Sequence, residues 1–233
     1  MNIKKIVRKA MELSGIYISR EPTYPNVLSL LKRYGITCQS VLHIGGHYAE
    51  EADSYRRNGI SRAIFIEGDP VIFEKMQKIL GRYPSFQSIQ ALLSDKSERV
   101  IFHVASNDGA SSSILTPARH LTERPDITFA ESKFLDTVTL DSLNLPKFDV
   151  VILDVQGAEH RVIRGGLETL GRANAIWVEV NAGFMYDGDA DSAKIVELLS
   201  ANFVPLYMNM NSNKWGDALF IRRIHNLSEN KSL

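Results

Sequence analysis

The chain has few cysteines, no surplus of either charge and no long apolar run, and each absence excludes a class of protein. Its only cysteine, Cys38, rules out an intrachain disulfide and a thiolate metal cluster. Lysine plus arginine and aspartate plus glutamate both number 27, which argues against nucleic acid as the main partner. No apolar stretch approaches the roughly 18 residues that span a bilayer, and the N-terminus lacks a signal-peptide core. We therefore expect a soluble, cytoplasmic protein without an integral membrane segment.

The apolar residues that are present suffice for one folded domain. The chain has 233 residues, of which 44% are hydrophobic and 23% charged. We predict a helical N-terminal extension over residues 1–36, a main domain over 37–225 and a polar tail over 226–233. Within the extension, residues 3–14 and 27–34 have helical spacing. A helix over residues 1–20 that contacts a membrane surface is the alternative to one that packs on the domain or on a partner.

The pattern over residues 41–70 is that of a nucleotide-binding βαβ unit. An apolar run meets the pair Gly45-Gly46, a segment with helical spacing follows over 47–58, and a second apolar run ends on Glu67. Glycine in such a turn lets a ligand approach the backbone closely. Glu67 follows Gly45 by 22 positions, a spacing that suits a carboxylate accepting hydrogen bonds from ribose hydroxyls.

A dinucleotide cofactor fits this turn poorly. The G-x-G-x-x-G fingerprint needs glycine at the positions that hold His47 and Glu50. A carboxylate at Glu50 or Glu51 would also repel a pyrophosphate at the start of the helix. S-adenosylmethionine has a ribose, an adenine and a positive sulfonium but no phosphate, so it suits these acids better. A nicotinamide-dependent oxidoreductase is the disfavoured alternative.

A second acid follows the next predicted strand. A helix is expected over residues 70–80, with proline at its first position, and a strand over 88–93 that ends before Ser94-Asp95. Ligands of open parallel sheets bind beyond the carboxyl ends of the strands. Glu67 and Asp95 should therefore point into one crevice; an ordinary polar turn at Ser94-Asp95 is the alternative.

A third predicted strand brings two more acids to the same edge of the sheet. The run 148–153 is apolar enough to be buried on both faces, and it ends on Asp154. Glu159 falls in the first turn of a helix predicted over 155–170. Two carboxylates at one sheet mouth are costly without partners, which favours a functional role over a simple complement to the helix dipole.

Residues 105–125 interrupt this regular alternation. The segment is polar, rich in serine and without periodicity, and loops of that length inside compact domains are usually functional or disordered. We predict a lid or substrate-binding loop, with disorder as the alternative. Its candidate contacts are Ser111, Ser112, Ser113 and His120.

The carboxyl-terminal part of the chain predicts an antiparallel hairpin. A strand over 175–180 carries Glu179 near its end and is followed by Asn181. Two further strands, over 204–208 and 217–222, have no helix between them, so they must run antiparallel. Trp215 is expected in the polar loop that joins them.

Six segments taken together resemble the FkbM family of S-adenosylmethionine-dependent methyltransferases, and the match runs from residue 41 to residue 221. These segments are the glycine turn at 45–46, IEGDP at 66–70, SSSIL at 111–115, LDVQGAEHRVIRGG at 153–166, EVN at 179–181 and WGDALF at 215–220. The resemblance implies a class I methyltransferase fold: an α/β, Rossmann-like, seven-stranded and mostly parallel sheet with an antiparallel last strand. It also implies S-adenosylmethionine as cofactor and a hydroxyl of a sugar, in a glycan or a secondary metabolite, as acceptor.

On this resemblance the cofactor contacts come from the ends of the first three strands. They are His43, Gly45, Gly46, His47, Glu67, Gly68, Asp69, Ser94 and Asp95, with Glu67 at the ribose and Asp69 and Asp95 beside the adenine. The sequence departs from the family at His43, where aspartate is usual, and at Ala49, where glycine is common and which we place in a helix. These departures support a second hypothesis, a non-catalytic relative that binds a glycan or a partner protein.

Methyl transfer to an alcohol needs alignment and a base for the hydroxyl proton. We predict that Asp154 is this base or orients the hydroxyl, with His120 and Glu159 as the next candidates. The predicted acceptor contacts are Ser112, Ser113, Gln156, Glu179, Asn181 and Trp215. No residues have the spacing of metal ligands, so no metal is expected, although carboxylates at the mouth leave Mg²⁺ as an alternative. The sequence gives no indication of oligomeric state.

Overall fold

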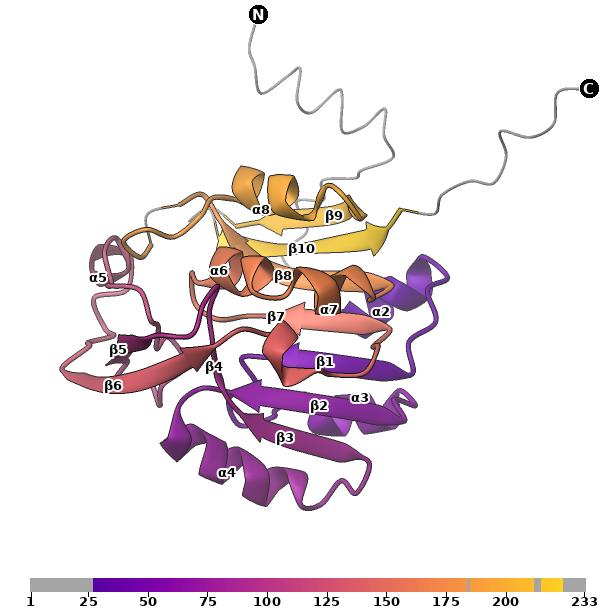
Figure 1. The fold of residues 1–233 in the computed structure, drawn as a ribbon, viewed down its shortest axis with the longest axis horizontal. Coiled ribbons are helices and arrows are strands. Elements are labelled where there is room, and N and C mark those ends of the chain that lie inside the picture. Colours follow the sequence, from indigo (N-terminus) through magenta and orange to yellow (C-terminus); the bar gives the residue numbers. More distant parts are fainter. Residues whose placement is uncertain (1–26, 184, 212–214, 224–233) are drawn as a thin grey trace, which may run out of the picture.

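The computed structural model describes residues 27–183, 185–211 and 215–223 (Figure 1). The helix predicted over residues 3–14 and the polar tail over 226–233 lie outside these described residues. The chain begins with α2 (Val27–Arg33), whose Leu28, Leu30 and Leu31 are buried in the core beneath the sheet. The predicted helix over 27–34 is therefore present and packs onto the main domain.

Seven strands form one sheet in the order β3-β2-β1-β7-β8-β10-β9. All neighbours pair in parallel except β10, which runs antiparallel to β8 and β9. This order and direction confirm the predicted class I methyltransferase fold. The strand bounds are β1 Ser40–Ile44, β2 Arg62–Glu67, β3 Phe86–Gln90, β7 Val150–Leu153, β8 Ala175–Asn181, β9 Phe203–Met210 and β10 Trp215–Arg222.

Helices cover both faces of this sheet because side chains of a buried strand alternate between two apolar environments (Figure 1). In β1, Val41 packs with α2, α3 (Ala52–Arg57) and α4 (Pro70–Leu80). The next residue, Leu42, packs with the helices of the opposite face, which are α6 Glu159–Arg164, α7 Leu167–Gly171 and α8 Ser192–Leu199. The resulting three layers hold the strand ends rigidly at one edge.

A second, three-stranded sheet stands beside that edge, and the sequence did not predict it. Its order is β4-β6-β5, and Figure 1 shows β5 and β6 projecting past the ends of the main strands. The predicted strand over 88–93 is divided between the two sheets, because the chain leaves the main sheet after Gln90 and Leu92 pairs with Thr137. The remaining bounds are β4 Leu92–Leu93, β5 Arg99–Val104, α5 His120–Glu123, β6 Glu131–Val138 and the 3-10 turn η1 Asp141–Leu143.

Two predicted helices are shorter than expected because left-handed residues precede them. The helix predicted from residue 47 begins only at Ala52, since His47 and Ala49 have φ of 41° and 57°. The prediction that Ala49 is helical is therefore wrong. The helix predicted over 155–170 begins at Glu159, after Gln156 at φ 54°, and is broken between α6 and α7.

Trp215 is also placed differently from the prediction. It is the first residue of β10, where it pairs with Asn181, rather than part of the preceding loop. Asn181 in turn is the last residue of β8. The hairpin itself, β9 followed by antiparallel β10, is confirmed.

Candidate active site

A cavity of about 410 Å³ lies at the carboxyl ends of β1, β2 and β7, and we call it the main cavity. After β1 the chain adds β2 and β3 on one side, while β7 and β8 lie on the other, so this is the switch point of the sheet. Each strand end, the start of α6 and the segment after β5 contribute to its wall. The lining includes His43, Gly45, Gly46, His47, Glu50, Glu51, Glu67, Gly68, Leu92, Phe102, Gly109, Ala110, Ser112, Ser113, Ile114, Asp154 and Gln156.

The glycine turn after β1 is required first by packing. Gly45 has φ 83°, and a Cβ there would lie 1.7 Å from the carbonyl oxygen of Asp154. A Cβ on Gly46 would lie 3.0 Å from the sulfur of Met76 and 3.1 Å from the Cβ of Phe65. The glycines therefore let the ends of β1 and β7 approach each other, and the ligand-facing surface of the turn is backbone.

Glu67 ends β2 with its carboxylate held by two backbone amides. The amide of His47 donates to Oε2 at 3.0 Å, and the amide of Asp69 donates to Oε1 at 2.8 Å. Burial raises the pKa of Glu67, and these two hydrogen bonds oppose that shift. Each carboxylate oxygen has a further lone pair, so the carboxylate is positioned and can still accept hydrogen bonds from a ligand.

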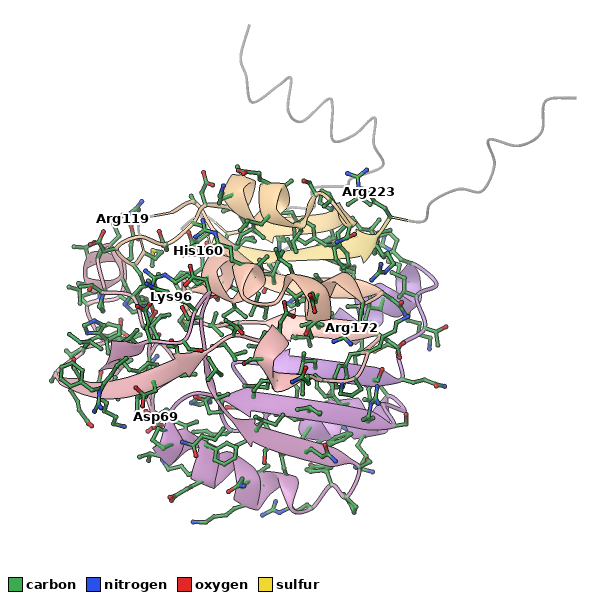
Figure 2. All side chains as sticks on the ribbon, in the orientation of Figure 1. Asp69, Lys96, Arg119, His160, Arg172 and Arg223 are labelled. Carbon is green, nitrogen blue, oxygen red and sulfur yellow. The ribbon has the colours of Figure 1, made fainter. Side chains whose placement is uncertain are left out.

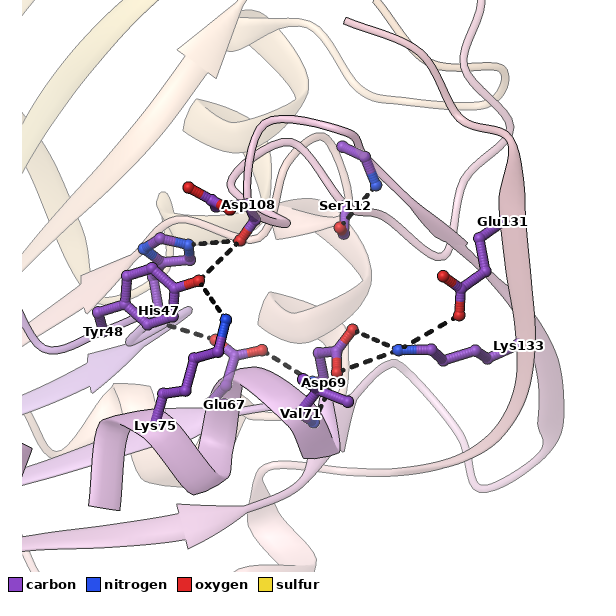
Figure 3. A network of polar contacts seen from close by, with 11 residues as sticks. His47, Tyr48, Glu67, Asp69, Val71, Lys75, Asp108, Ser112, Glu131 and Lys133 are labelled. Carbon is purple, nitrogen blue, oxygen red and sulfur yellow. Dashed lines mark hydrogen bonds and ion pairs between the residues drawn. The ribbon is translucent and has the colours of Figure 1, made fainter. Parts of the chain in front are cut away.

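His47 joins the turn after β1 to the segment after β5 (Figure 3). Its Nδ1 lies 2.7 Å from Glu50 Oε1, and its Nε2 lies 3.0 Å from the carbonyl oxygen of Asp108. Burial lowers the pKa of His47, but the bonds to Glu50 and Asp108 outweigh it, so the pKa is raised. Tyr48 adds to this connection, because its hydroxyl donates to the same carbonyl oxygen of Asp108 at 3.5 Å and accepts a 3.1 Å hydrogen bond from Lys75 of α4. The turn and the segment thus form one rim of the main cavity.

Asp69, which the sequence placed beside the adenine, lies outside the main cavity. Its side chain is buried and caps α4 by accepting from the amide of Val71 at 2.8 Å. Lys133 of β6 approaches the same carboxylate at 3.1 Å, so Asp69 ties the main sheet to the small sheet (Figures 2 and 3). The side chain has a structural explanation that needs no ligand.

Ser94 and Asp95 also lie outside the main cavity, contrary to the prediction of a crevice shared with Glu67. They follow β4 of the small sheet rather than a strand of the main sheet. The carbonyl oxygen of Ser94 would lie 2.2 Å from a Cβ on Gly165, so Ser94 packs against the end of α6. Asp95 Oδ2 lies 4.0 Å from Arg164. The misplacement follows from the division of the predicted strand.

His43, where the sequence departs from the family resemblance, lines the main cavity. It is buried, its Nδ1 lies 2.9 Å from the hydroxyl of Tyr55, and its ring stacks on Phe65 with centroids 5.3 Å apart. Both partners belong to the apolar layer that includes α3. These contacts hold the His43 ring in one wall of the main cavity.

Three carboxylates converge at the other side of the main cavity. Asp154 ends β7, Glu159 begins α6 and Glu179 lies in β8; one oxygen of each is within 4.8 Å of the others. We call these three residues the acid cluster. Glu159 is buried and accepts from the amides of Val155 at 2.8 Å and Gly157 at 3.2 Å. The sequence predicted the first two acids at this edge; it did not predict that Glu179 meets them.

Side-chain donors hold the rest of the acid cluster. Gln156 Nε2 donates to Asp154 Oδ1 at 2.7 Å and to Glu179 Oε2 at 3.3 Å, and the indole Nε1 of Trp215 donates to Glu179. Gln156 reaches both acids because its backbone adopts φ 54°. Two of the predicted acceptor contacts, Gln156 and Trp215, are thus donors to the acid cluster.

Burial raises the pKa of every acid in this group, and neighbouring carboxylates add to the shift at Glu159, Glu179 and Asp217. Burial raises the pKa of Glu159 to about 7, with Asp154 adding to the shift, and raises that of Glu179 well above its usual value. Asp217, which pairs with Glu179 across β10 and β8, is raised to about 7 by burial and then by Asp154. Desolvation also raises the pKa of Asp154, and the bond from Gln156 opposes it. The site is therefore built to take up protons near neutral pH.

Replacing Glu159 with glutamine should flatten the dependence of stability on pH. The folded pKa of about 7 lies above the value of about 4.3 for an ordinary glutamate, so the unfolded chain binds fewer protons and folding stability falls as pH rises through this window. Glutamine keeps an oxygen for the amides of Val155 and Gly157 but has no charge. We expect Glu159→Gln to match wild type near pH 5 and to exceed it by on the order of 2 kcal/mol at pH 8.

Thermal denaturation at both pH values measures this effect. The matched control is Glu168→Gln, which changes an exposed glutamate of α7 and should leave the profile as it is in wild type. A wild-type melting temperature that stays level between pH 5 and pH 8 would contradict the prediction.

Two of the remaining predicted residues line the main cavity, and two others are buried outside it. Ser112 and Ser113 line the main cavity, and Ser113 Oγ donates to the carbonyl oxygen of Gln156 at 2.8 Å. All of residues 105–125 are among the described residues, and the segment makes backbone hydrogen bonds to other parts of the chain. This supports an ordered loop over disorder. Asn181 is buried and accepts from the amide of Gly183 at 2.6 Å. His120 is buried outside the main cavity, beside Trp215.

Comparison with known proteins decides the family. The profile of the methyltransferase FkbM domain matches residues 41–205, which include β1, the glycine turn and the whole acid cluster. The chain belongs to the FkbM methyltransferase family. This confirms the resemblance that the six sequence segments indicated.

One curated relative and two solved structures show how this FkbM family member compares. The 2-O-methyltransferase NoeI of Sinorhizobium fredii is 29% identical over 170 residues, covering 68% of this chain and 70% of NoeI. The FkbM methyltransferase of Methylobacillus flagellatus has a TM-score of 0.54 at 14% identity, over 85% of this chain and 48% of that one. The magnesium protoporphyrin IX methyltransferase of Synechocystis, solved with bound S-adenosylmethionine, has a TM-score of 0.52 at 12% identity. The match covers 84% of this chain and 76% of that one.

These solved structures share the fold, and this chain spans about half the length of the Methylobacillus protein. No helix within the described residues is both long and apolar enough to cross a bilayer.

Proposed function

We propose that this protein is an S-adenosylmethionine-dependent O-methyltransferase that acts on a sugar hydroxyl of a glycan or a secondary metabolite. One observation carries the proposal: a single cavity has Glu67, positioned by two amides, on one side of β1 and Asp154, with the acid cluster, on the other. Membership of the FkbM family supports methyl transfer. The name of NoeI, a 2-O-methyltransferase, supports an oxygen as the accepting atom.

The residues of the main cavity fit the cofactor. Its volume of about 410 Å³ is in the range of small-molecule sites, roughly 300–1,000 Å³. Glu67 would hold the ribose hydroxyls, and the apolar side chains of Leu92 and Phe102 would contact the adenine. The negative charge around Asp154 suits a positive sulfonium. When bound, S-adenosylmethionine supplies an electrophilic methyl group on that sulfur.

The chain's own contribution is alignment and proton transfer. Asp154 would take the proton from the acceptor hydroxyl, and its raised pKa makes it a better base than an ordinary aspartate. Gln156 fixes the Asp154 carboxylate through its 2.7 Å hydrogen bond. The rim formed by His47 and Asp108 would keep water from the reacting groups.

Calorimetric titration with S-adenosylmethionine, with a parallel thermal-shift assay using NAD, tests the cofactor. We expect binding of the former alone, since the main cavity has acids where a pyrophosphate would lie. Transfer of a radiolabelled methyl group to a panel of methyl glycosides and cellular glycans then tests the reaction. Binding without transfer to any of them would favour the non-catalytic relative, and binding of NAD would favour the oxidoreductase.

A further inference from the structure

A second cavity of about 320 Å³ adjoins the main cavity, and we call it the side cavity. The two share Gln156 and Ala110 as wall residues. Residues of α5 and the first residue of β10 also line the side cavity. Its lining consists of Ala110, Ser111, His120, Glu123, Arg124, Gln156, Met185, Asn211 and Trp215.

Gln156 connects the side cavity to the predicted base, Asp154. Gln156 lines both cavities, and its amide donates at 2.7 Å to Asp154 and at 3.3 Å to Glu179. Trp215 also lines the side cavity, and its indole N–H donates to the same Glu179. A molecule that occupies the side cavity therefore lies next to the acid cluster without displacing anything from the Glu67 side.

His120 is the one buried side chain in the described part of the chain with an unpaired polar atom. Its side chain is 1% exposed, and Nδ1 has no hydrogen-bond partner among the described residues. Aromatic rings of Phe129, Tyr186 and Trp215 surround it at centroid distances of 5.2, 5.4 and 6.3 Å. An unpaired buried nitrogen is rare in folded proteins, and His120 also lines the side cavity, so its ring is the part of that wall with unused hydrogen-bonding capacity.

The chemistry of the side cavity favours an uncharged, hydroxyl-rich ligand. Burial lowers the pKa of His120, so its neutral imidazole can donate to or accept from a hydroxyl. Trp215 offers an aromatic face of the kind on which a sugar ring packs. The two charged wall residues are already paired, Glu123 with Arg119 and Arg124 with Asp126, so they present little net charge to a ligand.

We propose that the side cavity is the acceptor subsite, that it takes an uncharged sugar ring against Trp215, and that His120 holds one of the sugar hydroxyls. This inference rests on the proposed function, which supplies the sugar acceptor. It assigns His120 to acceptor binding and leaves proton transfer to Asp154. Gln156, which lines both cavities and contacts Asp154, then lies beside the point where the acceptor hydroxyl approaches that base.

Replacing His120 with phenylalanine tests the role of the nitrogen, because the ring and its aromatic packing are retained. Saturation-transfer NMR without cofactor, using the methyl glycosides of glucose, galactose and mannose and free glucuronic acid, measures acceptor binding directly. We expect a neutral glycoside to bind better than the uronic acid and His120→Phe to weaken that glycoside about five- to tenfold. In turnover, KM for the glycoside should rise while kcat changes little.

The matched control is His160→Phe. His160 is also a buried histidine with a pKa lowered by burial, but it lies on α6 (Figure 2) and lines neither the main nor the side cavity. A measurement on wild-type protein is needed in case a variant misfolds. In wild-type protein with isotope-labelled histidine, the glycoside should shift the NMR resonances of the His120 imidazole and not those of His160.

Unchanged His120 resonances with a glycoside bound, equal affinity in His120→Phe, or no glycoside binding to wild type at millimolar levels would each overturn the inference. The proposed function is tested separately by the cofactor titration. If S-adenosylmethionine binds and its methyl group is transferred while His120 remains unaffected, only the acceptor subsite is wrong. If S-adenosylmethionine does not bind, the proposed function itself fails.

Discussion

Replacing Asp154 with asparagine should lower turnover about 100-fold and leave the affinity for S-adenosylmethionine within about threefold of wild type. Asparagine has nearly the same shape and keeps an oxygen for the 2.7 Å hydrogen bond from Gln156. It cannot take up the hydroxyl proton. Because Glu67, on the other side of β1, keeps both of its amide hydrogen bonds, the ribose end of the main cavity is unaltered.

Steady-state turnover with radiolabelled cofactor and calorimetric binding measure the two halves of this prediction. Asp217→Asn is the matched control, because it replaces a carboxyl group beside the acid cluster at a residue outside the main cavity. It should reduce turnover far less than Asp154→Asn. Full turnover in Asp154→Asn would show that another group takes the proton, and Glu159, which also lines this edge, would be next to test.

Replacing Glu67 with alanine should weaken binding of S-adenosylmethionine about 10- to 100-fold, as expected for the loss of hydrogen bonds to a charged acceptor. The substitution removes the carboxylate that we assign to the ribose. It also leaves the amides of His47 and Asp69 without their acceptor, so the turn after β1 loses a hydrogen bond that holds it to the end of β2. Calorimetry at constant pH gives the dissociation constant.

Asp69→Asn separates this effect from general damage to the end of β2. Asparagine keeps an oxygen for the amide of Val71 but removes the charge that faces Lys133. We expect a lower melting temperature with little change in cofactor affinity, because Asp69 lies outside the main cavity. Cofactor binding that falls as far in Asp69→Asn as in Glu67→Ala would instead support the sequence-based placement of Asp69 beside the adenine.

The central strands could be predicted because their signal is local. The runs that became β1, β2, β7 and β8 are mainly apolar, as strands buried on both faces must be, and each is followed by or ends on a polar residue or a glycine pair. Pro70 and Gly81 likewise mark the two ends of α4 in the sequence. The class of fold and the position of Glu67 and Asp154 at one edge follow from these runs and the rule that parallel strands share an edge.

The small sheet could not be predicted, because its pairing partners are far apart in the chain. Leu92 continues the apolar run of β3, yet it pairs with Thr137, and nothing near residue 91 indicates that the chain changes sheets there. The errors at Ser94 and Asp95 follow from this one step. The left-handed residues His47, Ala49 and Gln156 were missed because none of them is glycine, the residue type that signals such a conformation in a sequence.

By itself, the sequence determined the order of buried strands, the edge at which their acids lie and the family, because periodicity, glycine turns and motif order are properties of neighbouring residues. Only the tertiary structure decided which of those residues meet: that Glu179 joins Asp154 and Glu159, that Asp69 caps a helix, and that His120 stands with an unpaired nitrogen beside Trp215. These outcomes depend on distances between segments dozens of residues apart, and such distances are fixed by how whole layers pack.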